Sequence, residues 1–358
     1  MTILLIFLLA VQSVYWYSFS KLGQKASFTS HTDPLPASSV VICARNAAPQ
    51  LEANLHKVLD QRHPEFEVIV CDHDSDDDTG TVLERMDSEK RHLSVHKVTK
   101  NRPGKREALW KGIDNSRHPV VIMTDADCAP VSSGWLRQMS APFIKSETHI
   151  VLGYSPILPG QHRSGYWAHF EGWMTGVQYL SYAMHGLPYM GVGRNVAYRR
   201  EILSESVLNR HGDLASGDDD LTVMQLATKT NTALCLAPET FVTTPAAPSW
   251  SSYVRQKRRH YSTAPHYKPL TKALLGTFSM TQILFYLGLV LLVASGSALQ
   301  AILLYALRQL LLLYPVHKLM GTLQAQFKLH HFPVLDAGLA LHYLLFSLAV
   351  LFPQKSSW

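Results

Sequence analysis

Two acidic residues lie one position apart near the middle of the chain, in the stretch TDADC at 124–128. They follow an apolar run, 119–123, that predicts a buried β-strand. Residues i and i+2 of an extended segment point to the same side, so Asp125 and Asp127 can face one ligand. Mg²⁺ and Mn²⁺ prefer oxygen ligands and commonly combine one or two carboxylates with phosphate oxygens. The pair therefore predicts a divalent-cation site on substrate phosphates, with a solvated acidic turn as the alternative.

Two further stretches carry residues that suit a nucleotide. Asp72 follows the apolar run 66–71, where its carboxylate can accept hydrogen bonds from a base or a ribose. The acids at 76–78 fit a solvated loop that caps the next helix. Gly104 permits close backbone approach and Lys105 can neutralise phosphate, although an ordinary basic helix start explains both residues equally well.

The later part of the chain has an acidic and a basic cluster. Asp218, Asp219 and Asp220 open a helix, where acids are favourable, but three exceed what capping requires. One of them is therefore a candidate general base towards an acceptor hydroxyl. Gln256 and Arg259 lie one helical turn apart in a basic run and can reach a single target, unless the run binds lipid head groups.

These residues need a scaffold that brings them together. Strand patterns at 39–43, 66–71, 93–98 and 120–124 alternate with helical patterns at 49–59, 79–88 and 105–113. This alternation predicts βαβ units and a parallel sheet, so the fold class is α/β. Ligands bind such sheets at the carboxyl ends of the strands. We therefore expect Arg45, Asp72, Asp125 and Asp127 to converge on one crevice.

The ends of the chain are apolar. Hydrophobic residues make up 47% of the sequence and charged residues 17%. Residues 1–20 form a charge-free run that predicts an uncleaved transmembrane anchor rather than a signal peptide, because no basic segment precedes it. The region 274–353 contains three further candidate spans, at 274–293, 298–314 and 334–352, of which two or three cross the membrane. Arg308 makes the second of these tilted, interfacial or buried against its neighbours.

Charge places the domain between these ends in the cytoplasm. Lys21 and Lys25 follow the first apolar run, so the domain at 36–267 is cytoplasmic by the positive-inside rule. The net charge of +6 suits an anionic leaflet, and no basic stripe with interleaved aromatics predicts nucleic-acid binding. The four cysteines are scattered without a CxxC pair, which is typical of buried thiols in a reducing compartment.

Taken in order, the motifs resemble those of membrane-bound family-2 glycosyltransferases. The resemblance covers about 40–261 and the flanking apolar segments. Gly217 stands where the family has Glu, and His260 where it has Trp. The matching stretches are Arg45-Asn46-Ala47, Asp72-His73-Asp74-Ser75, Gly104-Lys105 with Ala108-Leu109, Asp125-Ala126-Asp127, Gly217-Asp218-Asp219-Asp220-Leu221, Gln256-Lys257-Arg258-Arg259-His260 and, beside the donor sugar, Gly193-Arg194-Asn195.

The resemblance implies a GT-A fold, which is a Rossmann-like nucleotide-diphospho-sugar transferase domain, with a Mg²⁺ or Mn²⁺ cofactor and inversion at the anomeric carbon. It also implies roles for individual residues. Asp218 aligns with the catalytic base, and Asp219 remains an alternative. The other implied roles are donor-nucleotide binding by Arg45, Asp72, Lys105 and Asp125, metal binding by Asp127 and Asp125, and pyrophosphate or acceptor contacts by Gln256, Arg259, His260 and Asn195.

These observations predict an inner- or plasma-membrane hexosyltransferase of class EC 2.4 that acts in cell-envelope polysaccharide synthesis. It would move a sugar from a nucleotide-diphospho-sugar, with a UDP-sugar favoured, to a lipid-linked or membrane-proximal glycan acceptor. Its expected partners are membrane lipid and polysaccharide-assembly proteins, with no nucleic acid. The alternatives are a non-catalytic nucleotide-sugar-binding membrane subunit, motivated by Gly217 and His260, and a nucleotidyltransferase, which would not explain the late acidic cluster.

Overall fold

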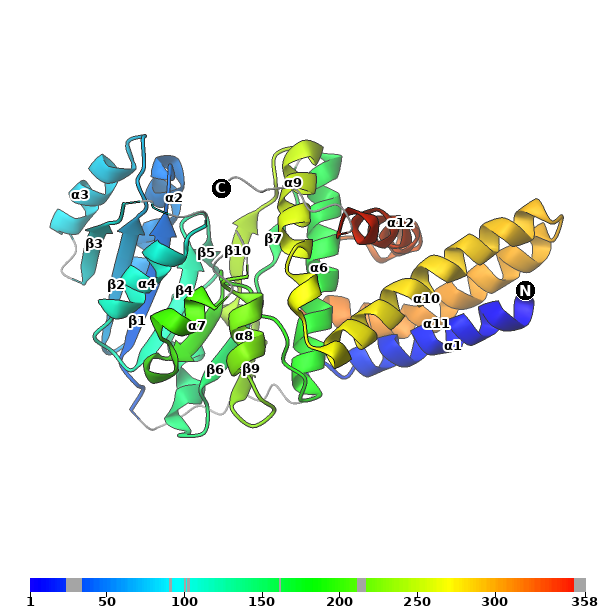
Figure 1. The fold of residues 1–358 in the computed structure, drawn as a ribbon, viewed down its shortest axis with the longest axis horizontal. Coiled ribbons are helices and arrows are strands. Elements are labelled where there is room, and N and C mark those ends of the chain that lie inside the picture. Colours follow the sequence, from blue (N-terminus) through cyan, green and yellow to red (C-terminus); the bar gives the residue numbers. More distant parts are fainter. Residues whose placement is uncertain are drawn as a thin grey trace.

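The computed structural model describes residues 1–23, 34–89, 92–99, 101, 104–160, 162–210 and 217–350. Arg102 and Pro103, and the end of the predicted third span at 351–352, lie outside these ranges. Figure 1 shows an α/β domain at one end of the molecule and a bundle of long helices at the other. The two parts meet at a layer of helices, and the candidate site lies on the α/β side of that layer.

A seven-stranded sheet forms the centre of the α/β domain, in the order β3-β2-β1-β4-β8-β6-β9. Strands β1 to β4 are parallel, as the alternation of strands and helices predicts, whereas β8 runs antiparallel to both of its neighbours. A smaller sheet has the order β5-β10-β7. The strands are β1 Ser38–Ala44, β2 Phe66–Asp72, β3 Leu93–Lys97, β4 Val120–Asp125, β5 Ala129–Pro130, β6 Ile150–Gly153, β7 Ile157–Leu158, β8 Val196–Arg199, β9 Thr232–Cys235 and β10 Val242–Pro245.

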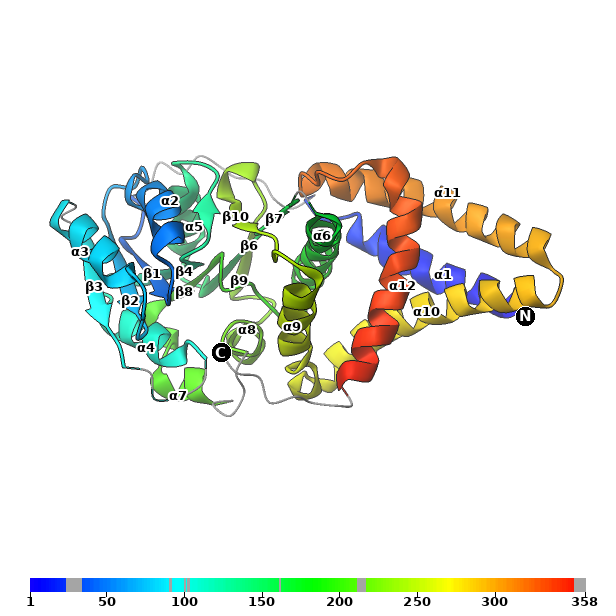
Figure 2. The same cartoon turned by 90° about the horizontal axis from the view of Figure 1, so that it is seen from above.

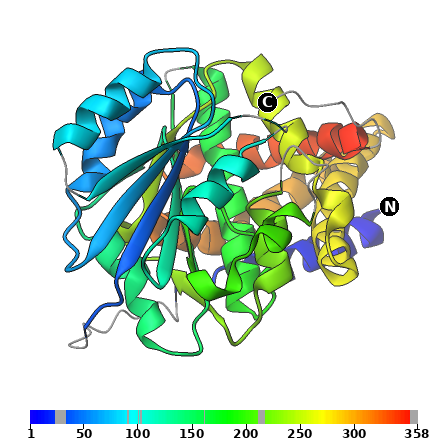
Figure 3. The ribbon, with the colours of Figure 1, turned by 60° about the vertical axis from the view of Figure 1, so that its left-hand side comes forward.

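Helices cover both faces of the large sheet, so the central strands are apolar on both sides. Val40 and Ile42 of β1 belong to the core that α2 and α5 cover. Val41 points the opposite way, into a core shared with α4 and α6. This alternation follows from the two-residue period of a strand. The covering helices are α2 Ala48–Leu59, α3 Thr79–Glu89, α4 Arg106–Asp114, α5 Trp135–Ser140, α6 Arg163–Met184, α7 Glu205–Asn209 and α8 Asp220–Leu226. Figure 3 shows the blue strands of the sheet over much of their length, with the helices α2 and α3 on one side.

Three long apolar helices form the bundle: α1 Thr2–Phe19, α10 Pro269–Ala294 and α11 Ala298–Thr322. Each has the length and apolar composition needed to cross a membrane. Their outward side chains are apolar and exposed, for example Ile3 at 84% and Leu310 at 70%. The three helices run side by side in both Figure 1 and Figure 2. The first two apolar segments of the C-terminal region and the N-terminal segment are thus long helices, as predicted.

The last helix, α12 Phe332–Val350, forms at the predicted third apolar segment. It crosses the direction of the bundle and lies between the bundle and the helices α6 and α9 Trp250–Tyr261 (Figure 2). On its inward face Asp336 and His342 are buried against polar partners on other helices. Among the described residues of the C-terminal region, α10 and α11 are the helices with the length and apolar composition of a span.

Candidate active site

The Asp125–Asp127 pair lies where β4 ends. Asp125 is the last residue of the strand, and a turn closed by the Cys128 N–H and the Asp125 carbonyl places Asp127 beside it. The ligand atoms of Asp125, Asp127 and Cys128 lie within 4.8 Å of one another. Burial and the neighbouring Asp125 carboxylate raise the pKa of Asp127, a cost that a bound cation would relieve. Because Mg²⁺ and Mn²⁺ prefer oxygen to sulfur, the two carboxylates fit such an ion better than the Cys128 thiol does.

Lys105 connects this pair to the later acidic cluster. Gly104, at φ +93°, turns the chain just before Lys105, which occupies the N-cap position of α4. The Lys105 Nζ lies 2.8 Å from Asp125 Oδ1 and 3.5 Å from Asp218 Oδ2. Burial alone would lower the pKa of Lys105, but the charges of the surrounding acids raise it well above its usual range. Lys105 therefore stays charged and is shared between two parts of the site.

The three acids at 218–220 have three different environments. Asp218 pairs with Lys105. Asp220, at the start of α8, accepts hydrogen bonds from Thr263 Oγ1 and the Tyr267 hydroxyl, both at 2.6 Å, and so anchors the chain that follows α9. Asp220 is therefore a structural residue.

Asp219 lies against the backbone of Gly193, where an added Cβ would be 2.1 Å from its Oδ1. A side chain at position 193 would therefore displace the Asp219 carboxylate. Burial raises the pKa of Asp219 to about 7, with a further contribution from Asp218, while Lys105 acts in the opposite direction. A carboxyl group with a pKa near neutrality is suited to general base catalysis.

The segment before β8 carries a cation that the sequence reasoning missed. The charge of Arg194 acts on both Asp125 and Asp127, and its Nε donates to Ser155 Oγ at 3.0 Å. The neighbouring Asn195, which we predicted to contact ligand, is instead fully buried. Its Oδ1 accepts from Trp135 Nε1, and its Nδ2 donates to the carbonyls of Tyr154 and Thr240. The only sequence signal for Arg194 was its place beside Asn195 in a glycine-rich segment.

Helix α9 brings the predicted Gln256–His260 stretch to the same region. The charge of Arg259 acts on Asp125, so α9 contributes a cation to the region around the end of β4. Gln256 is half-buried and His260 is exposed near the end of the helix. The other predicted cation, Arg45, is half-buried directly after β1.

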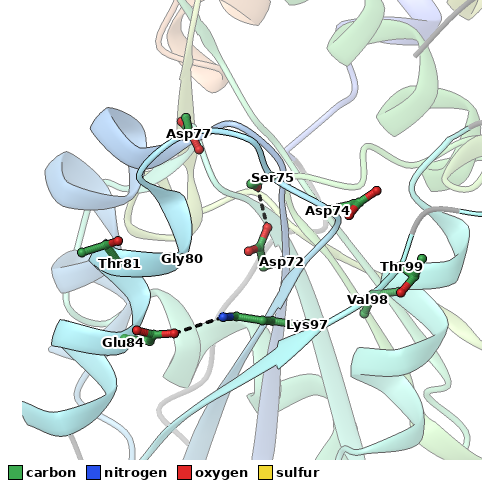
Figure 4. A pocket seen from close by; sticks show the side chains of 10 residues that line it. All are labelled: Asp72, Asp74, Ser75, Asp77, Gly80, Thr81, Glu84, Lys97, Val98 and Thr99. Carbon is green, nitrogen blue, oxygen red and sulfur yellow. Dashed lines mark hydrogen bonds and ion pairs between the residues drawn. The ribbon is translucent and has the colours of Figure 1, made fainter.

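Asp72 lies at the end of β2 beside a cavity of about 320 Å³ (Figure 4). Its Oδ1 accepts a hydrogen bond from Ser75, and the Lys97–Glu84 ion pair, at 3.1 Å, lies at the other side of the cavity. Asp72 is paired in register with Ala44 of β1. The residue before Ala44 in the same strand, Cys43, is paired with Asp125 of β4 on the other side of β1. Since neighbouring strands are about 4.8 Å apart and β1 lies between β2 and β4, the Cα atoms of Asp72 and Asp125 are roughly 10 Å apart. That separation suits a nucleoside at Asp72 whose phosphates reach Asp125.

Comparison with known proteins agrees with this arrangement. Residues 39–207, which run from β1 past β8, match the family model described as glycosyl transferase family 2. The match supports the predicted transferase class.

One relative and two solved structures can be compared in detail. TuaG of Bacillus subtilis (strain 168), named as a teichuronic acid biosynthesis glycosyltransferase, is 30% identical over 92 residues, which are 26% of this chain and 36% of that protein. The chain thus spans about a third of the length of this relative. The mannosyltransferase PcManGT from Pyrobaculum calidifontis, solved with GDP-Man and Mn²⁺, has a TM-score of 0.61 at 18% identity, over 99% of both chains. TarS 1–349 of S. aureus has a TM-score of 0.44 at 16% identity, over 88% of this chain and 81% of its own. The PcManGT likeness shows that this chain has a GT-A fold.

Proposed function

We propose that this chain is a membrane-anchored, inverting glycosyltransferase that transfers a sugar from a nucleotide-diphospho-sugar to an acceptor at the membrane. The observation that carries the proposal is the placement of Asp125 and Asp127, at the end of β4, among the charges of Lys105, Arg194 and Arg259. Carboxylates alone would repel a diphosphate. Carboxylates that hold a cation, with basic side chains around them, attract it.

The donor would lie along the carboxyl ends of the strands. Its nucleoside would occupy the cavity beside Asp72, and its diphosphate would lie between the Asp125–Asp127 pair and the basic side chains. A bound Mg²⁺ or Mn²⁺ would supply Lewis-acid stabilisation of the departing nucleoside diphosphate. PcManGT, with the same fold, was solved with GDP-Man and Mn²⁺, which agrees with a nucleotide-sugar and a divalent cation here. A UDP-sugar remains our prediction from the sequence.

We assign the catalytic base to Asp219, which the sequence left as the alternative to Asp218. Asp218 forms an ion pair with Lys105 at 3.5 Å, whereas burial raises the pKa of Asp219 to about 7. Its carboxylate would take the proton of the acceptor hydroxyl while the acceptor oxygen forms a bond to the anomeric carbon. The bond from that carbon to the diphosphate oxygen breaks in the same step, which inverts the configuration.

The acceptor is proposed to be lipid-linked or a membrane-proximal glycan. Three helices could cross a membrane, and each has one end beside the catalytic domain (Figure 2). The similarity to TuaG supports a role in the synthesis of a cell-envelope polysaccharide. In this arrangement α1, α10 and α11 are inserted in the inner or plasma membrane, and the α/β domain lies on its cytoplasmic side.

The test is a screen of the detergent-solubilised full chain against UDP-, GDP- and dTDP-sugars with Mn²⁺ or Mg²⁺, followed by lipid-linked acceptors. The Asp127→Ala variant and EDTA serve as controls. Metal-dependent turnover of one donor, lost in the variant, would support the proposal and identify the sugar. Metal-dependent binding without turnover on any acceptor would favour a non-catalytic subunit. Failure to bind every donor would overturn the proposal.

A further inference from the structure

A buried polar network joins α6, α9 and α12 behind the candidate site. At its centre, Glu171 of α6 forms an ion pair with Lys257 of α9. The two side chains are only 6% and 8% exposed. His342 of α12 completes the group, with its Nε2 at 4.0 Å from Glu171 Oε1. The three residues come from three helices that are far apart in the sequence.

The His342 ring lies within hydrogen-bond distance of two tyrosine hydroxyl groups, both from α9. The Tyr253 hydroxyl lies 3.4 Å from its Nδ1, and the Tyr261 hydroxyl lies 3.2 Å from its Nε2. Tyr253, Lys257 and Tyr261 are spaced four residues apart, so they lie on one face of α9. The network therefore fixes the rotation of α9 and its position along its own axis.

Helix α9 also carries Arg259, which the proposed reaction uses at the diphosphate. Arg259, two residues from Lys257, acts electrostatically on Asp125. Whatever fixes Lys257 therefore also fixes where the Arg259 guanidinium lies relative to the diphosphate.

The other end of the network is equally well anchored. Asp336 of α12 accepts hydrogen bonds from Arg308 of α11 at 2.7 and 2.9 Å and from Gln282 of α10 at 2.8 Å. Helix α12 is thus fixed to the bundle through Asp336 and to the catalytic domain through His342. It forms a crosspiece between the two parts (Figure 2).

We propose that Glu171, Lys257 and His342 are positioning residues, which set α9 on α12 so that Arg259 is held at the diphosphate. This inference rests on the proposed function. A buried ion pair contributes little net stability compared with well-packed apolar side chains, but its fixed geometry can specify one arrangement of the helices. A shift of α9 relative to α12 would destabilise the transition state most, because that is where charge develops on the departing diphosphate.

The main test compares His342→Phe with His342→Gln in the full chain, reconstituted in lipid nanodiscs. Phe keeps the packing but removes both ring nitrogens, whereas Gln retains a polar group for the tyrosine hydroxyls. We expect kcat to fall about 10- to 100-fold in H342F, because a displacement of about 1 Å can have an effect of that size, and to recover in part in H342Q. The KM for the donor and the Kd for its nucleoside diphosphate should stay within about threefold of wild type, since the nucleoside contacts are untouched.

Three further variants keep the test decisive. The Glu67→Gln change breaks an ion pair at the start of β2, between the buried Glu67 and the exposed Arg117, and should leave kcat unchanged. The double variant E171L/K257M replaces the ion pair with apolar side chains, so that it folds even if single changes do not, and it should show the same fall in kcat. In an R259A background the effect of H342F should disappear, because both changes act through one side chain.

Amide hydrogen exchange over 250–261 supplies a readout that does not depend on turnover. Exchange should be about tenfold faster or more in H342F than in wild type and unchanged in E67Q. Wild-type kcat with wild-type exchange in H342F would overturn the inference, as would independent effects of H342F and R259A. If wild type transferred no sugar, the proposed function would fall, and the exchange result would still decide whether the network positions α9.

Discussion

The Arg308–Asp336 pair of the bundle and the acids around Lys105 use the same side-chain chemistry in opposite ways. Arg308 and Asp336 are fully buried and meet through two hydrogen bonds, and Gln282 and Tyr286 satisfy further atoms of the pair. Around Lys105, by contrast, one ammonium group is shared between Asp125 and Asp218. Asp127 and Asp219 remain with raised pKa values.

The difference separates a structural use of charge from a functional one. Burial is tolerable when each charge finds its partner inside the protein, as in the bundle. At the end of β4 the acids outnumber the nearby bases, so the missing partner has to come from outside. A divalent cation, a diphosphate and an acceptor hydroxyl together would complete that set.

The largest expected effect is loss of the cation. The Asp127→Ala change should lower turnover by about 10³-fold or more, because one of two carboxylate ligands is removed and the Lewis-acid contribution is lost with it. Steady-state assays over a Mn²⁺ titration and calorimetric Mn²⁺ binding would measure it. Asp87→Asn, an exposed acid on α3, is the matched control. Full activity in D127A would place the cation elsewhere.

The next effect concerns the base. The Asp219→Asn change should lower kcat by about 10²-fold or more while donor binding is retained. Since Asp219 acts as a base only when ionised, wild-type kcat should rise with pH through about 7. Lys105, Asp218 and Asp125 are the charged groups that set this pKa, and the profile of D219N should be flat there. A pH profile unchanged in D219N, together with a collapse in D218N, would instead make Asp218 the base.

In the bundle, breaking the Arg308–Asp336 pair should lower the stability of the protein and not its turnover directly. Asp336→Asn leaves Arg308 as an uncompensated buried charge and should lower the free energy of unfolding by about 3–5 kcal/mol. The double variant R308M/D336L should recover most of that loss, since apolar side chains can replace a buried pair. Thermal unfolding in detergent would measure both variants. An unchanged melting temperature in D336N would mean that water reaches the pair.

Asp219 should also destabilise the protein at high pH. Its folded-state pKa of about 7 lies above the ordinary value of 3.8, so the folded protein binds this proton more tightly than the unfolded chain does. Its contribution to stability is therefore present below about pH 4 and is lost as pH rises through about 7. D219N should accordingly melt at a higher temperature than wild type at pH 8, by about 2–4 °C for each kcal/mol gained. A smaller difference between the two melting temperatures at pH 5 than at pH 8 would serve as the internal control, since the effect builds up between about pH 4 and pH 7.

The sequence predicted the parallel half of the sheet well because local patterns determine it. The runs 39–43, 66–71 and 120–124 became β1, β2 and β4 with bounds differing by one residue or none. The Asp125–Asp127 pair was predicted from the two-residue period of an extended segment, but β4 ends at Asp125 and a turn places Asp127 beside it. The antiparallel strand β8 has four residues and was not predicted. Its position depends on pairing with β4, more than 70 residues earlier in the chain.

Long-range packing also explains the features of the site and of α12 that the sequence did not predict. Arg194 reaches Asp125 only because β8 is inserted between β4 and β6, and the same insertion buries Asn195 against Trp135. Nothing in a single sequence distinguishes these neighbours. The apolar composition of α12 likewise suits a span, and only Arg308 and the hydroxyls of α9 show why its polar residues face inward.

The smallest effect should come from the exposed ion pair beside the Asp72 cavity. Lys97 and Glu84 have side chains 71% and 68% exposed. Lys97→Ala should therefore change stability by less than about 1 kcal/mol and the Kd for a nucleoside diphosphate by at most about threefold. Isothermal titration with UDP and GDP would measure it, with Arg85→Ala, from another exposed pair away from the cavity, as the control. A far larger loss of binding in K97A alone would mean that Lys97 contacts the nucleoside, and that even exposed charges at this end of the sheet serve the ligand and not the fold.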